Sequence, residues 1–171
     1  MKSKALLFPA LLISFAVATA PAAAQPCGNP EQVTLFGGQT IDTGTVTVSN
    51  FDLASITVTY TTNDPWVITA VHLAVADSLA GIPQNGNHNP LPGHFPINTT
   101  YNPPVTTVTF TIPFGNLIPG ETIFIGAQAE VQAPGGQGGG SQTAWGFGPR
   151  FGGHNWATYI KYTVQACSLP E

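Results

Sequence analysis

Aromatic and basic side chains are concentrated in one glycine-rich stretch, residues 142–159. This stretch contains Trp145, Arg150 and Trp156, together with two phenylalanines and a histidine. Glycines let aromatic rings lie flat against the backbone, and an arginine among the rings can stack on them or bind a carboxylate or a sugar hydroxyl. We therefore predict a ligand-binding platform here, with a glycan as its ligand. The structural alternative is that the tryptophans fill one end of the fold while a salt bridge holds Arg150.

Histidines raise the question of a metal site. The chain has four of them, His72, His88, His94 and His154. Zinc requires three or four converging ligands, and no two of these histidines have the close spacing of a known ligand pair. We predict no metal and no cofactor, and we add His72 and His94 to the candidate ligand-binding residues.

Two glutamates, Glu121 and Glu130, are the only pair that suggests glycoside hydrolysis. Both fall on one predicted strand, and a rise of about 3.3 Å per residue separates them by roughly 30 Å. That distance is too large for two carboxylates to act on one glycosidic bond. No serine lies in a nucleophile elbow either. The sequence therefore predicts no catalytic residues, and we expect that the protein is not an enzyme.

Alternation of apolar residues with threonine is the main structural signal. It is typical of half-buried strands at residues 45–48, 55–61 and 106–112, while 66–76 and 122–132 are apolar on both faces and indicate central strands. Further strands are predicted at 32–36 and 156–165. The pattern predicts an all-β fold, an antiparallel β-sandwich of about seven or eight strands, immunoglobulin-like or jelly-roll-like. Residues 77–104, rich in proline and asparagine, predict a long loop, and the glycine-rich residues 134–140 predict a hairpin tip.

The two ends of the chain indicate export. A basic start, an apolar run and three small residues before Gln25 predict a signal peptide over residues 1–24, which leaves one domain over 25–171. No later segment of the sequence is apolar enough to cross a membrane. In an oxidising compartment Cys27 and Cys167, the only cysteines, are expected to form a disulfide. We expect a secreted protein, located outside the cell, on its surface or in a periplasm.

The charge of the exported chain limits its partners. Without the signal peptide, two basic residues stand against eight acidic ones, a formal charge of −6. Nucleic acid requires clustered lysine and arginine, so it is excluded as a partner. Charged residues make up only 7% of the chain, which is typical of a polar but weakly charged surface. Such a surface suits contact with glycans, with an extracellular matrix or with other copies of the same chain.

Several motifs together resemble a family of secreted bacterial β-domains of unassigned activity. They are the residues from His72 to Val75, the NPLPGHFP sequence of residues 89–96, and the segments TAW, RF and NWATY between residues 143 and 159. The similarity runs from about residue 39 to residue 163. Members of that family often carry histidine where this chain has Gln128. The resemblance implies a secreted β-sandwich and supplies no catalytic residue.

Two functions follow from these observations. The first is a non-catalytic binding module for a glycan or matrix, with Trp145, Arg150, Trp156, His72 and His94 at its site. The second is a self-assembling subunit of an envelope, filament or matrix, which the scarcity of lysine and the uncharged threonine faces favour, because charge usually protects strand edges.

Overall fold

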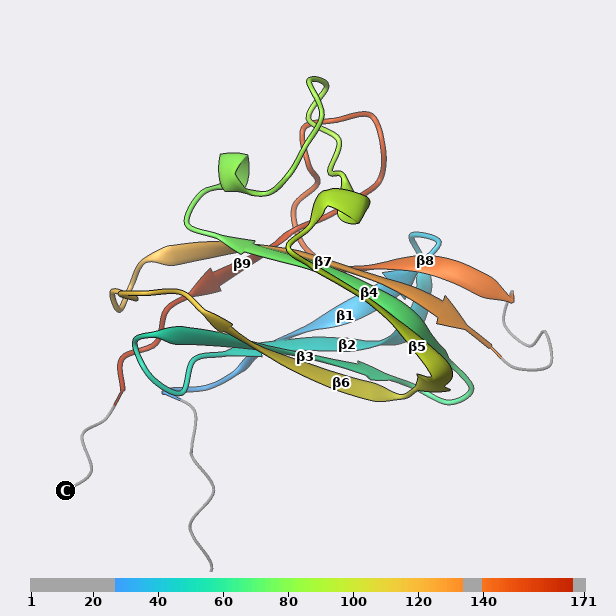
Figure 1. Ribbon diagram of the computed structural model, residues 1–171, viewed down its shortest axis with the longest axis horizontal. Coiled ribbons are helices and arrows are strands. Elements are labelled where there is room, and N and C mark those ends of the chain that lie inside the picture. Colours follow the sequence, from blue (N-terminus) through green and yellow to red (C-terminus); the bar gives the residue numbers. More distant parts are fainter. Residues whose placement is uncertain (1–26, 134–139, 168–171) are drawn as a thin grey trace, which may run out of the picture.

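A single antiparallel β-sheet, folded over on itself, forms the body of the protein (Figure 1). The computed structural model describes residues 27–133 and 140–167, which contain nine strands. The strands are β1 (Glu31–Gly37), β2 (Ile41–Ser49), β3 (Ser55–Thr62), β4 (Val67–Ala76), β5 (Ile97–Val105), β6 (Thr107–Pro113), β7 (Thr122–Gln132), β8 (Ser141–Gly146) and β9 (Ile160–Thr163). Two short 3₁₀ helices, η1 (Leu79–Gly81) and η2 (Pro92–His94), lie between β4 and β5.

The sheet closes almost into a barrel. Its strand order is β5–β4–β7–β8–β1–β2–β3–β6, and β9 pairs with β7. In Figure 1 the β4, β5 and β7 layer lies above the β2, β3 and β6 layer. The first and last strands of this path are β5 and β6. They are consecutive in the chain, connected by the single residue Thr106, and do not pair with each other. The predicted all-β, antiparallel, sandwich-like fold is confirmed.

Alternation along the strands separates the core from a threonine surface. On β3, Ile56 and Val58 are fully buried, whereas Thr59 and Thr61 point to the outer face. The outer hydroxyls of Thr59 and Thr109, which lie opposite each other on β3 and β6, are 2.9 Å apart. The main core gathers the inward side chains of both layers, among them Leu35, Val46, Val48, Tyr60, Ile68, Leu73, Ile123, Ile125 and Tyr162.

Two of the expected elements differ from the structure, and one strand was not expected. The loop predicted over residues 77–104 ends at residue 96, because 97–105 form β5. Prolines 103 and 104 obscured this strand in the sequence, and an edge strand tolerates them because half of its N–H groups need no ladder partner. The strand predicted over 156–165 is limited to Ile160–Thr163, because the preceding residues belong to a loop. Residues 141–146, read from sequence only as part of the ligand platform, form β8.

Cys27 and Cys167 form the predicted disulfide, which joins the two ends of the domain. Beside it lies Asn50, a fully buried residue. Its side-chain amide donates to the carbonyl of Gln165 at 3.1 Å, and its side-chain oxygen accepts from the Tyr162 hydroxyl at 2.6 Å. The terminal segment is therefore held to the end of β2 by a covalent bond and by a buried polar network. The disulfide also indicates an oxidising compartment.

A smaller apolar cluster lies on the outer face of the β4–β7–β8 layer. It consists of Ala74, Ile82, Phe95, Trp145, Phe151, Ala157 and Tyr159. Two loops supply most of these side chains, residues 77–96 and residues 147–159, and Figure 1 shows them together above the sheet. The two loops are also joined by a hydrogen bond from the Asn155 amide to the Asn89 side chain at 3.0 Å.

Some predictions fall on other parts of the chain. The signal peptide predicted over residues 1–24 lies outside the described residues, as do residues 134–139 of the predicted glycine-rich hairpin tip. In the two stretches that the structure does describe, no helix has the length and hydropathy needed to cross a membrane.

Candidate functional site

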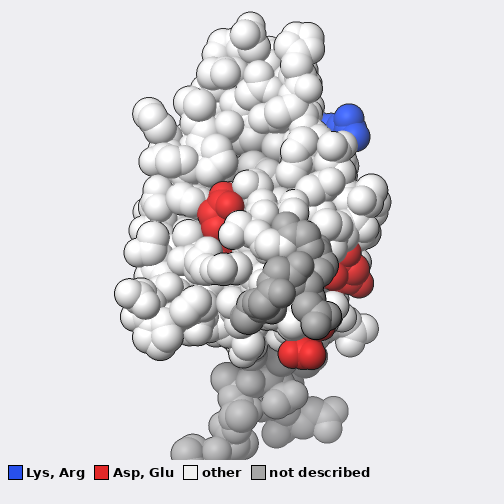
Figure 2. Space-filling model, turned by 90° about the vertical axis from the view of Figure 1, so that its right-hand side faces the viewer, with Lys and Arg blue, Asp and Glu red and all other residues white. Residues whose placement is uncertain are grey.

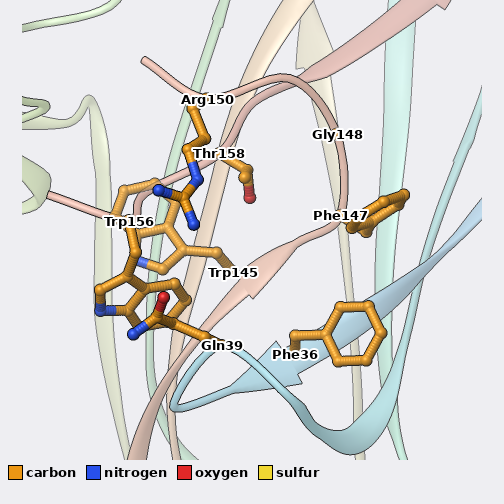
Figure 3. A pocket seen from close by; sticks show the side chains of 8 residues that line it. All are labelled: Phe36, Gln39, Trp145, Phe147, Gly148, Arg150, Trp156 and Thr158. Carbon is orange, nitrogen blue, oxygen red and sulfur yellow. The ribbon is translucent and has the colours of Figure 1, made fainter. Parts of the chain in front are cut away.

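A pocket of about 120 Å³ lies beside the 147–159 loop, and three of the five predicted ligand-binding residues line it (Figure 3). Its lining consists of Phe36, Gln39, Trp145, Phe147, Gly148, Arg150, Trp156 and Thr158. In Figure 3 Trp156 and Phe147 lie on opposite sides of the pocket, and Trp145 and Phe36 extend into it from the sheet strands, with Arg150 and Gln39 at the rim. The pocket is thus an aromatic slot with polar groups around its opening.

Pairing of β1 with β8 creates the floor of this slot. Phe36 on β1 lies directly opposite Trp145 on β8, and both point to the outer face of the sheet. The backbone N–H of Phe147 donates to the carbonyl of Thr34 at 2.8 Å, which carries the chain past the end of β8 over β1. The Phe147 ring then meets the Phe36 ring edge to face, with centroids 5.6 Å apart. Phe147 remains 59% exposed, so its ring is available to a ligand.

The loop that bears Arg150 and Trp156 is a hairpin closed by backbone hydrogen bonds. Its two arms are joined by backbone hydrogen bonds from Phe151 to Ala157 at 3.1 Å and from Tyr159 to Pro149 at 3.0 Å. Between these bonds, Arg150 and Thr158 pair as an isolated bridge, which places both on the pocket side. The arms therefore hold Arg150 at the rim without help from a ligand.

Trp145 serves both of the roles considered for it. Its ring is only 4% exposed and packs edge to face against Phe95 and Phe151, with centroid distances of 6.4 and 6.1 Å. Most of the ring therefore belongs to the smaller apolar cluster, as the structural alternative holds, while the remaining part forms the pocket floor. Trp156 is less buried, and it packs against the edge of the same cluster.

Arg150 is the only charged residue of the pocket lining. Its side chain is exposed, and within residues 27–133 and 140–167 no carboxylate pairs with it, so the salt bridge considered from the sequence is not formed there. Lys161 is the other basic residue in the described part of the chain. Figure 2 shows charged side chains as isolated spots on a largely uncharged face. The pocket is therefore a local positive site on an acidic protein.

The two histidines predicted at the site do not line the pocket. His94 is exposed on η2. His72 lies on β4, directly opposite the buried Gln128 of β7, and Gln128 in turn lies opposite Trp145. His72 is thus two strands away from the pocket floor. Neither histidine lines the pocket, and their role as ligand contacts stays a prediction.

A partly satisfied polar pair lies in this same row of residues. The Gln128 amide donates to a carboxylate oxygen of Glu130 at 2.6 Å. The Gln128 side-chain oxygen and Nδ1 of His72 are both buried and have no hydrogen-bond partner among the described residues. Water molecules typically bind where two buried polar atoms without hydrogen-bond partners lie on neighbouring residues.

Sequence reasoning missed four of the lining residues that have side chains: Phe36, Gln39, Phe147 and Thr158. Phe147 and Thr158 lie inside the glycine-rich stretch 142–159, whose composition already indicated a ligand platform. Phe36 and Gln39 lie at the other end of the chain, and only the pairing of β1 with β8 brings them to the pocket. Gln39 also has a left-handed backbone, with φ of 82°, in the tight turn between β1 and β2.

Among the described residues, no group of three or more His, Cys, Asp or Glu side chains is placed to hold a metal ion. The eight lining residues include no carboxylate, imidazole or thiol. A ligand in the pocket would therefore meet aromatic surface, one cation, one amide and one hydroxyl. Groups of these kinds are able to bind and orient a polar molecule, and the set contains no general acid or base with an ordinary pKa near neutrality.

Comparisons with known proteins assign no family to the chain. No protein-family model matches it, and no curated protein matches it. Among solved structures, it is similar to the crystal structure of a "putative carbohydrate binding protein" from Bacteroides uniformis, with 11% sequence identity and a TM-score of 0.34. The match covers 70% of this chain and 54% of the other, so this chain spans about half the length of that protein. A TM-score this low carries no argument about function, and the family resemblance drawn from the sequence motifs stays a prediction.

Proposed function

We propose that the protein is a secreted, non-catalytic carbohydrate-binding module, and that its ligand binds in the aromatic slot between Trp156 and Phe147. The observation that supports this most is the composition of the slot, in which two aromatic walls face each other below polar side chains at the rim. A sugar ring has apolar faces that pack on aromatic rings and equatorial hydroxyls that need hydrogen-bond partners at its edge. The slot offers both kinds of contact at once.

The size and opening of the slot favour a single sugar unit. At about 120 Å³ it is smaller than the sites of roughly 300–1,000 Å³ that enclose a whole drug-sized ligand. A chain-terminal or protruding residue of a longer glycan fits such a site, while the rest of the glycan stays outside. The fixed hairpin around Arg150 favours this role, because a preformed site loses little entropy when the ligand binds.

Arg150 makes saccharides that carry a carboxylate the preferred ligands within this class. Its guanidinium is a planar, permanently charged donor that can bind a carboxylate through two parallel hydrogen bonds. Because none of the eight described lining residues is acidic, this charge is not compensated by them. Neutral sugars would still bind through the aromatic walls, with lower affinity.

A glycan array followed by calorimetry tests the proposal. We expect Phe147→Ala to weaken binding of the best ligand by about tenfold, which corresponds to about 1.4 kcal/mol. Phe51→Ala is the matched control, because Phe51 is also an exposed phenylalanine, at 38%, and is absent from the slot. If the array yields no ligand, or if Phe147→Ala and Phe51→Ala bind equally well, the slot is not a carbohydrate site.

A further inference from the structure

The free edge of β6 is the least protected part of the sheet. β6 is the last strand of the sheet path, and within residues 27–133 and 140–167 only β3 pairs with it along its length. Its sequence, TVTFTIP, contains no charged residue, although charges are a usual means by which proteins keep edge strands from pairing. The opposite end of the path is better protected, although β6 also ends in a proline, Pro113. In β5, residues 101–104 fall outside the register with β4 and include Pro103 and Pro104.

The core is also incompletely covered along β6. On the neighbouring β3, the inward residues Ile56, Val58 and Tyr60 are all fully buried. Their partners on β6, namely Ile112, Phe110 and Val108, are only partly buried, although they point to the same core. This difference means that the apolar side chains of β6 lack a neighbour on the side away from β3. A further strand at that edge would bury them and would pair the outward backbone groups of β6.

We propose that β6 pairs with β6 of a second copy of this chain, in antiparallel orientation about a two-fold axis at Phe110. Pairing about that axis places Val108 opposite Ile112 of the second copy, and the two Phe110 rings opposite each other. On the outer face, Thr109 comes opposite Thr111 of the second copy. From Val108 to Ile112 the edge is self-complementary in this arrangement, because apolar residues meet apolar ones and threonines meet threonines. At the two ends of the paired segment, Thr107 comes opposite Pro113 of the second copy.

A second copy suits this edge for two further reasons. The threonine pairs repeat a contact that the fold already makes, since the Thr59 and Thr109 hydroxyls lie 2.9 Å apart across β3 and β6. The acidic chain repels its copies in general, but the seven residues of β6 are uncharged and so place no like charges against each other at the point of contact. The paired sheets would form one continuous threonine-covered surface across both copies.

The extent of the interface sets the expected strength. A single pair of seven-residue strands buries less surface than the roughly 1,600 Å² of a standard stable complex. We therefore expect a reversible dimer with a dissociation constant in the range of about 10 to 500 μM, the weak end of specific association. The pocket lies on other strands, so pairing and ligand binding are independent of each other.

Sedimentation velocity measures the fraction of dimer and tests the proposal. The wild-type chain and charge variants are compared from about 5 μM to 1 mM, a range that spans the expected dissociation constant. Thr109→Lys with Thr111→Lys places like charges opposite each other across the two-fold axis, which should abolish the dimer. Thr109→Lys with Thr111→Glu places a lysine opposite a glutamate of the second copy, which should restore it. Thr45→Lys with Thr47→Lys adds the same charge to the same outer face on the interior strand β2, and should leave the dimer unchanged.

Each result decides the proposal. A wild-type chain that remains monomeric up to about 1 mM, well above the expected dissociation constant, overturns it. So does a lysine pair on β6 that still dimerises while circular dichroism shows the native fold, or a lysine and glutamate pair that fails to restore association. The expected combination in the Thr109→Lys with Thr111→Lys protein is loss of the dimer with unchanged glycan affinity, because no residue of β6 lines the pocket.

Discussion

Replacing Gly148 with alanine should destabilise the hairpin that forms the pocket, because this position has no room for a side chain. A Cβ atom there would overlap the carbonyl oxygen of Tyr159 and would lie 3.0 Å from its carbonyl carbon. Both are backbone atoms, so no rotation of a side chain can relieve the overlap. The two arms of the hairpin would have to move apart instead.

The cost of that movement can be estimated from the contacts between the arms. Overpacking of a close contact costs about 1–3 kcal/mol. Separation of the arms also weakens the hydrogen bonds from Phe151 to Ala157 and from Tyr159 to Pro149, each with a net value of about 1 kcal/mol. We therefore expect Gly148→Ala to lower the free energy of unfolding by about 3–5 kcal/mol, a large part of the stability of a single domain.

Equilibrium unfolding in urea, with the disulfide intact, measures this change. Gly93→Ala is the control, because a Cβ at Gly93 would meet no atom within 4 Å and its backbone is outside the left-handed region. That variant should be within about 1 kcal/mol of wild type, and slightly more stable if anything. A Gly148→Ala protein as stable as the Gly93→Ala protein would show that the hairpin arms are not packed as described. The placement of Arg150 by these arms would then be wrong as well.

Three further predictions concern the ends of the domain and one turn. Replacing Cys27 and Cys167 with serine removes a cross-link across 140 residues, and the chain-entropy model gives a loss of about 5 kcal/mol at 25 °C, measurable as a lower urea midpoint. Asn50→Ala should cost about 3 kcal/mol or more in the same assay, because Tyr162 and the Gln165 backbone lose their buried partner, and a loss below about 1 kcal/mol would contradict this role. Asp52 accepts hydrogen bonds from the Ala54 amide and from Ser55, which lower the pKa of its carboxyl below the ordinary value. Because the folded-state pKa is lowered, the ionised carboxylate stabilises the fold at pH values above the unfolded-state pKa, and this contribution is lost as the pH falls through the folded-state pKa. The free energies of unfolding of wild type and Asp52→Asn should therefore differ near pH 7 and converge at about pH 2.

The strands of the fold were largely predictable because their signal is local. The alternation in residues 55–61 identifies the inward and outward faces of β3 from that segment alone, and the structure places them as expected. β5 escaped prediction because its prolines are compatible only with an edge, and edge position is a property of the whole sheet. The strand predicted over 156–165 was too long, because its first residues pair across a hairpin with residues 149–151 rather than with another strand.

The candidate site was predictable only in the part that one segment supplies. Trp145, Arg150 and Trp156 lie close together in sequence, so their composition alone indicated a platform. Phe36 joins them because β1 pairs with β8, a contact between distant parts of the chain whose register no local pattern specifies. His72 and His94 were included on residue type, and their distance from the pocket depends on how many strands separate them from it.

By itself, the sequence determined the class of the fold, the disulfide between its ends and the acidic, weakly charged surface, because composition, alternation and cysteine number are properties of the chain. Only the tertiary structure decided that the aromatic residues form a slot, and that within the described part of the chain Arg150 has no carboxylate partner and β6 lies at a free edge. These features depend on which strands become neighbours, and strand order is set by packing of the whole core rather than by any one segment.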